Sequence, residues 1–166
     1  MIWGMTTSTF TVVHVLLSLA GIASGAIVVS GLLSGRRLDG WTGIFLTTTV
    51  ATSVTGFGFP FDQLLPSHKV GIASLALLGA AILARYVFQL VGAWSPIYVI
   101  CAIAALYLDV LVAVVQAFRK VPALTALAPT QSEPPYVITQ VIVLLLFGVL
   151  TILGAKRFRR ELGLAP

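Results

Sequence analysis

Charged side chains are scarce in this sequence, and their scarcity sets the class of the protein. Only 9% of the 166 residues are Asp, Glu, Lys or Arg, whereas 58% are hydrophobic. A soluble domain carries about 25% charged residues. The mean hydropathy is +1.06. This composition excludes an ordinary soluble domain and predicts an all-α integral membrane helix bundle in which the lipid bilayer is the main partner.

Cysteine is almost absent too. The single Cys101 excludes an internal disulfide and any cysteine cluster for zinc or iron–sulfur. It lies in an apolar run, where an inert packing role is expected. The sequence also lacks a Walker loop, a nucleophile elbow and a His-Glu-x-x-His motif, so an enzyme is disfavoured and no catalytic residue is assigned. The net charge of +5 gathers at the ends of the apolar runs and reports topology rather than nucleic-acid binding.

Five apolar runs predict about five transmembrane helices in one domain. The expected spans are residues 9–33, 41–59, 70–93, 96–118 and 136–155, followed by a basic tail at 156–166. The second span is the least secure, because the hydroxyl side chains of its second half make it polar: Thr47, Thr48, Thr49, Thr52, Ser53 and Thr55. Such hydroxyls can bond to a carbonyl four residues back. Six of them in one span favour a helix enclosed by its neighbours. Gly21 and Gly25 in the first span predict a close-packed seam.

The distribution of Lys and Arg predicts the orientation. With five spans, six basic residues lie on one side of the membrane and three on the other: Arg36, Arg37, Lys156, Arg157, Arg159 and Arg160 against Lys69, Arg119 and Lys120. The side with more Lys and Arg is normally cytoplasmic. We therefore expect a periplasmic amino terminus and a cytoplasmic carboxyl terminus in a bacterial inner membrane.

Three polar residues fall inside the predicted spans: Arg85, Asp109 and Gln116. An ionisable group in hydrocarbon needs a partner, a water-filled cavity or a route to the interface. Arg85 either snorkels to the nearby interface or reaches Asp109 across a stretched hairpin. Asp109 is too deep to snorkel. It shares a stripe of helical spacing with Ala102, Ala105, Ala113 and Gln116, so this stripe is expected to face protein rather than lipid.

Two histidines fall at the same predicted outer level of the membrane, His14 in the first span and His68 at the start of the third. Two imidazoles on different helices are the minimum for a b-type haem. With Asp62 or Glu133 they could instead hold a transition metal. A plain packing or interfacial role for both histidines is the third alternative.

The pattern resembles small, uncharacterised bacterial inner-membrane proteins of four or five spans. The resemblance rests on residues 55–61, on Leu65-Pro66-Ser67-His68 and on the loop at 120–135. It implies a bacterial inner membrane and transfers no functional residue. Three functions stay open: a non-catalytic accessory or assembly subunit, which the small size favours; a haem or metal protein using His14 and His68; and a proton or solute path along Asp109, Gln116 and the Thr-rich span.

Overall fold

The protein is all-α, as the composition predicts. The computed structural model describes residues 2–59 and 66–161, and this part of the chain contains helices and no β-strand. The helices are α1 (Thr7–Leu33), α2 (Asp39–Gly56), α3 (Pro66–Ile82), α4 (Trp94–Lys120), α5 (Pro122–Leu127) and α6 (Pro134–Glu161), with a π-helical segment η1 (Leu83–Val87) after α3. Asp62, which the sequence suggests as a metal ligand, lies outside the described residues.

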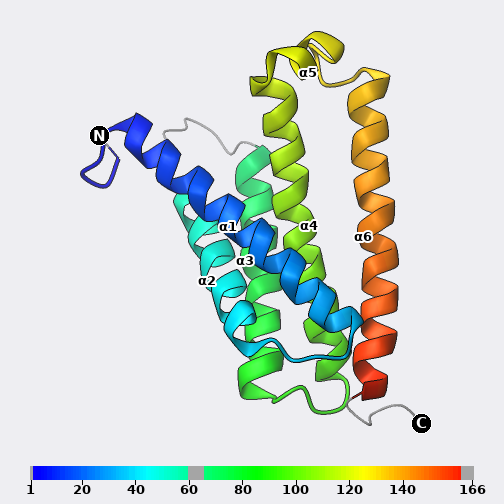
Figure 1. Cartoon of the computed structure of the whole chain (residues 1–166). Helices are drawn as coiled ribbons and strands as arrows, with labels where there is room; N and C mark the ends of the chain where they lie inside the picture. The colour runs from blue at the N-terminus through cyan, green and yellow to red at the C-terminus, as the bar shows by residue number, and fades with distance from the viewer. Residues whose placement is uncertain (1, 60–65, 162–166) are drawn as a thin grey trace.

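The long helices run alternately up and down (Figure 1). α1 crosses the others at a tilt, and α3, α4 and α6 run nearly side by side. The first residues of α1 and the connection through α5 lie at one end of the bundle, and α6 finishes at the other end, near the connections α1–α2 and η1–α4. The start of α1 and the end of α6 are therefore at opposite ends of the bundle, because five long helices run alternately along it.

Four of the helices are long and apolar enough to cross a membrane: Thr7–Leu33, Ser67–Val87, Trp94–Lys120 and Pro134–Phe158. We therefore treat the protein as an integral membrane protein. The second predicted span, residues 41–59, forms α2, which has 18 residues but is not apolar enough to be among these four. Its threonines explain the difference, because each hydroxyl lowers hydropathy without preventing a helix.

α2 packs one face against its neighbours and leaves the opposite face exposed, with Trp41, Ile44 and Val54 each at least 43% exposed. Its buried residues Thr42, Phe45, Leu46, Thr49, Thr52 and Ser53 recur at helical spacing and form one face. Thr48 and Thr55 lie off that face, and their hydroxyl groups form hydrogen bonds within α2. Thr48 donates to the Ile44 carbonyl oxygen at 2.7 Å, and Thr55 donates to the Ala51 carbonyl oxygen at 2.7 Å. The Thr-rich composition is thus compatible with burial inside the bundle.

The connection from α3 to α4 is tighter than the sequence indicates. The third helix begins at Pro66 and its α-helical part stops at Ile82, whereas the predicted span continued to residue 93. The π-helical turn η1 follows, and then Gln89, Leu90 and Gly92 adopt positive φ values of 51°, 61° and 57°. A side chain at positive φ is uncommon, so this turn is held by its surroundings rather than by its own sequence.

The connection after α4 and the bounds of α6 also differ from the prediction. The loop after α4 contains the short helix α5, and α6 begins at Pro134 and continues to Glu161. The first part of the predicted basic tail is therefore the last turns of α6, and residues 162–166 lie outside the described chain. A helix with Lys156 and Arg157 near its carboxyl end is favoured, because cations stabilise that end of the helix dipole.

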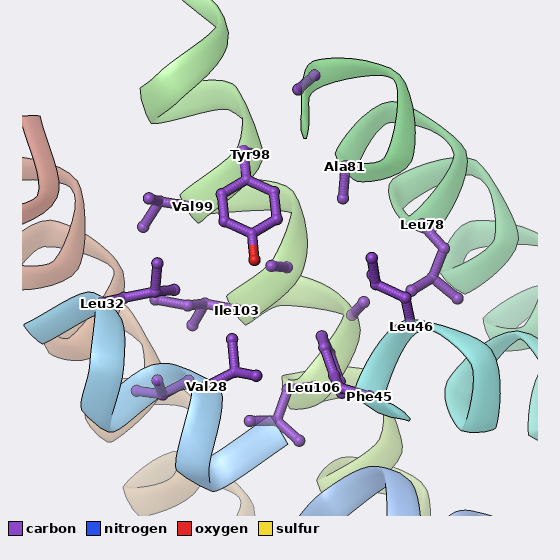
Figure 2. Close-up of a cluster of buried hydrophobic side chains, with 14 of the residues drawn as sticks. Val28, Leu32, Phe45, Leu46, Leu78, Ala81, Tyr98, Val99, Ile103 and Leu106 are labelled. Carbon is purple, nitrogen blue, oxygen red and sulfur yellow. The ribbon is translucent and has the colours of Figure 1, made fainter. Parts of the chain in front are cut away.

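The apolar core lies where α1, α2, α3 and α4 meet (Figure 2). Val28 and Leu32 come from α1, Phe45 and Leu46 from α2, and Leu78 from α3, and all are buried against the middle of α4. The α4 side of the core is formed by Tyr98, Val99, Ala102, Ile103, Ala105 and Leu106. Small residues at 102 and 105 let the helices approach closely, which is how membrane helices pack.

Candidate functional site

A cavity of about 90 Å³, with both polar and apolar lining residues, lies between α1, α2, α3 and α4 on the same side as the first turns of α1. Three ionisable residues line it, His14 from α1, His68 from α3 and Asp109 from α4. Its other polar lining residues all carry a hydroxyl: Ser18, Thr52, Ser53, Ser67 and Ser74. The sequence predicts that the two histidines approach each other, and the structure places both on the wall of this one cavity.

His14 is held by its contacts with the carboxyl end of α2. Its Nδ1 lies 2.8 Å from the Thr55 hydroxyl, and its ring meets that of Phe59 edge-on at 5.3 Å. The single hydroxyl hydrogen of Thr55 goes to the Ala51 carbonyl oxygen, so the hydroxyl accepts from Nδ1–H of His14. The neutral ring then keeps its lone pair on Nε2. Thr55 therefore sets which nitrogen of His14 can accept a proton.

His68 is 4% exposed and lies in the first turn of α3. Its ring stacks on that of Phe57, with centroids 5.4 Å apart and an interplanar angle of 27°. Close by, Ser53 donates a hydrogen bond of 3.1 Å to Ser74, which joins α2 to α3 in the wall of the cavity. The aromatic stack and this buried hydroxyl pair fix the wall on the α3 side.

Asp109 is 7% exposed and faces α1 and α2, as its place in the α4 stripe predicts. A Cβ added at Gly21 would lie 3.4 Å from Asp109 Oδ2 and 3.0 Å from the Thr49 hydroxyl, so glycine gives these two polar side chains the most room against α1. The Thr49 hydroxyl and the Asp109 carboxyl interact with each other, but Asp109 Oδ2 and Thr49 Oγ1 fall short of ordinary hydrogen-bond geometry with any described residue. A buried carboxyl with so weak a protein partner is costly, and Asp109 lines the cavity, where water can supply the missing hydrogen bond.

The size of the cavity decides which ligand fits. At about 90 Å³ it holds roughly three to six waters, since one water needs about 15–30 Å³. Pockets for drug-sized ligands and cofactors measure about 300–1,000 Å³. The haem hypothesis for His14 and His68 stays a prediction, and the volume favours water. Within residues 2–59 and 66–161, no three His, Cys, Asp or Glu side chains are grouped to hold a metal ion.

Glu133, the other predicted metal ligand, has a different role. Its carboxylate accepts hydrogen bonds from the backbone N–H and the hydroxyl of Thr130, at 3.1 and 2.9 Å, and from the N–H of Ser132 at 3.1 Å. It thus closes the turn before α6. Partial desolvation alone would raise the pKa of Glu133, but these hydrogen bonds together outweigh it and lower the pKa.

Arg85 does not pair with Asp109. Its guanidinium forms an ion pair with Asp39, the first residue of α2, and lies over the ring of Tyr98 with Cζ 5.1 Å from the centroid. Of the two alternatives for Arg85, the pair with Asp109 is therefore not formed, because η1 ends the third helix early and turns Arg85 toward the start of α2. Arg85 is 6% exposed while Asp39 is 79% exposed, so the pair joins the bundle interior to its surface.

Gln116 also departs from the prediction. Ala102, Ala105 and Asp109 are buried, Ala113 is half-buried, and Gln116 is exposed. Figure 1 shows α4 and α6 extending past α2 and α3 toward α5, so the stripe leaves the packed part of the bundle there. Gln116 is therefore not part of the polar interior. Cys101 is half-buried at the edge of the core, as a packing residue would be.

Several site residues were not identified from the sequence. Asp39 follows a polar turn, Thr55 is one of several hydroxyl residues in a Thr-rich run, and Tyr98 follows a connection rich in aromatic residues, so none of the three is conspicuous in the sequence. Only their spacing from other polar residues along α2 and α4 could have indicated an inward orientation. Comparison with known protein families, with curated proteins and with solved structures finds no match for this chain.

Proposed function

We propose that this protein takes up protons from one face of the membrane into a hydrated, buried site at Asp109. The observation that carries the proposal is the water-sized cavity shared by Asp109, His14 and His68. A carboxyl group inside a membrane bundle normally marks an ion or proton pathway, because its burial is too costly to be incidental. Cavity waters would supply the hydrogen bond of ordinary geometry that Asp109 Oδ2 does not make with the protein.

A proton fits this site better than a metal ion. The three ionisable lining residues are not grouped as ligands for one ion. They belong to three helices around a volume that waters can bridge, and imidazole and carboxyl groups both exchange protons readily. His14 contributes a defined acceptor nitrogen because Thr55 holds its Nδ1–H. In this account His14 receives a proton near the mouth of the cavity and water passes it to Asp109.

The proposal includes an orientation. We place the cavity side of the bundle on the periplasmic face of a bacterial inner membrane, because the opposite side carries more Lys and Arg. Protons would then enter from the side where respiring bacteria hold them at higher concentration.

The accessory-subunit role stays a prediction. Among the described residues, α6 is the helix that could support this role, because it is the candidate span most exposed to its surroundings. In its apolar stretch 11% of the residues are buried, compared with 28–39% in the other candidate spans. An apolar outer face of this kind suits lipid as well as a partner helix. Uptake of protons at Asp109 is compatible with work in a larger complex, but the lining of the cavity supports it independently.

Infrared difference spectroscopy tests the proposal, because it detects the C=O stretch of a protonated carboxylic acid. We expect a band that appears as the pH falls, shifts in D₂O, and is absent in Asp109→Asn. Glu133→Gln is the control, since it removes a carboxyl group outside the bundle core. A band that Asp109→Asn leaves unchanged would refute the proposed site, and a band that does not shift in D₂O would show that water does not reach it.

A further inference from the structure

Polar groups continue past the cavity along the same faces of α2 and α4. On α2, Thr52 and Thr49 are followed by Thr42, two turns nearer the start of the helix. On α4, Asp109 is followed by Tyr98, about 16 Å away at about 1.5 Å per residue. Tyr98 and Ser95 are completely buried, and their hydroxyl oxygens make no hydrogen bond of ordinary geometry within the described chain, although the Tyr98 hydroxyl interacts with the side chains of Thr42 and Arg85. These groups form a second buried polar region.

The second region reaches the opposite surface through the ion pair of Arg85 and Asp39. The ring of Tyr98 lies under the Arg85 guanidinium, and Asp39 is largely exposed. The positive charge of Arg85 alone would repel a proton, and the carboxylate of Asp39 neutralises it. The π-helical segment η1 presents Arg85 here, and such segments occur often at functional sites.

Between the two polar regions lies a short apolar barrier. Phe45 and Leu106 are buried and meet at Gly25, where an added Cβ would lie 2.6 Å from Leu106 Cδ1 and 2.9 Å from Phe45 Cε2. Figure 2 shows the Tyr98 hydroxyl pointing from α4 into the cluster that holds these side chains. The Phe45–Leu106 contact therefore lies between the Asp109 level at Gly21 and the Tyr98 level.

We propose that the two polar regions are the halves of one proton path across the bundle, and that the Phe45–Leu106 contact against Gly25 is its gate. This inference rests on the proposed function of Asp109. A hydrophobic constriction blocks conduction by excluding water, and it opens when its side chains part. The structure has the gate closed. A proton entering at the cavity is held at Asp109, passes Phe45 when water enters, and leaves beside Tyr98 and Asp39.

Proton flux into liposomes tests the gate. The full-length protein is reconstituted with a pH-sensitive dye inside, and a potassium gradient with valinomycin supplies the driving force and balances the charge. Phe45→Ala removes the barrier, and we expect its flux to exceed that of the parent by about tenfold, equivalent to lowering the barrier by about 1.4 kcal/mol. Phe118→Ala is the matched control, because Phe118 is buried on α4 against Tyr136, away from the path.

The inner half is tested with Tyr98→Phe, which removes one hydroxyl and keeps the ring. We expect it to lower the flux of both the parent and Phe45→Ala, whereas Tyr107→Phe, whose ring packs against Phe147, leaves both unchanged. Should Phe45→Ala fail to fold, Leu106→Ala opens the same contact. If a folded Phe45→Ala or Leu106→Ala protein conducts protons no faster than Phe118→Ala, the proposed gate is wrong. If Tyr98→Phe leaves the proton flux unchanged, the proposed path beside Tyr98 is wrong.

The two proposals fail in different ways. An infrared band from Asp109 together with a flux insensitive to these substitutions leaves proton uptake in place and removes the through-path. If the parent protein shows no such infrared band, the proposed function itself is wrong.

Discussion

Gly25→Ala tests the packing that separates the two polar regions. The added methyl group would lie 2.6 Å from Leu106 Cδ1 and 2.9 Å from Phe45 Cε2, well inside van der Waals contact. Overpacking of a filled core costs about 1–3 kcal/mol. Replacing a helical glycine by alanine returns about 0.5–1 kcal/mol through lower backbone entropy in the unfolded chain. We therefore expect a net destabilisation of roughly 1 kcal/mol and at most about 2.5 kcal/mol, the difference of these two effects.

The matched control is Gly79→Ala, also inside a helix, where an added Cβ meets nothing within 4 Å. Only the entropic effect applies there, so we expect a stabilisation of about 0.5–1 kcal/mol. Unfolding in mixed detergent micelles, followed by circular dichroism, measures both variants. Opposite signs are the expected result. If Gly25→Ala proves as stable as Gly79→Ala, then α1 does not pack against Phe45 and Leu106 as described, and the barrier loses its structural basis.

Three further predictions concern other parts of the chain. Ala105→Leu should destabilise the bundle by about 1–3 kcal/mol, because Ala105 is completely buried at the α4 seam; an unchanged melting temperature would count against a tight seam. Reporter fusions after Pro166 should be active only in the cytoplasm, and periplasmic activity would reverse the orientation. Glu133 has a lowered pKa, so its carboxylate should stabilise the turn before α6 at pH values above its ordinary pKa of 4.5 and lose this effect as the pH falls through the lower folded value; hydrogen exchange at Thr130, compared with Glu133→Gln across that range, should show the difference vanish in acid.

The helices themselves follow from the sequence because long apolar runs leave few alternatives. In lipid the backbone must satisfy its own hydrogen bonds, so a run of about 20 apolar residues becomes a helix whatever its partners are. The close contact at Gly21 and Gly25 also follows from spacing alone. The exact end of the third helix does not, because the π-turn and the positive φ values of Gln89 and Leu90 depend on packing between distant segments.

The candidate site follows from the sequence only in part. Counting residues from the ends of the spans places His14 and His68 at one level, and the cavity joins them. The partner of Arg85 could not be obtained this way, since its geometry depends on where η1 turns and on the start of α2. Gln116 keeps the helical spacing of Asp109 but lies where α4 leaves its neighbours. Periodicity gives the direction in which a side chain points, and it does not tell whether another helix is present there.

The account depends most directly on the protonation of one carboxyl group. Infrared difference spectra of the parent protein and Asp109→Asn, recorded in membranes in H₂O and D₂O, measure it. The account predicts a protonated-carboxyl band in the parent protein that responds to pH, shifts in D₂O and disappears with Asp109→Asn. A parent spectrum without such a band, or a band that persists in Asp109→Asn, would contradict it.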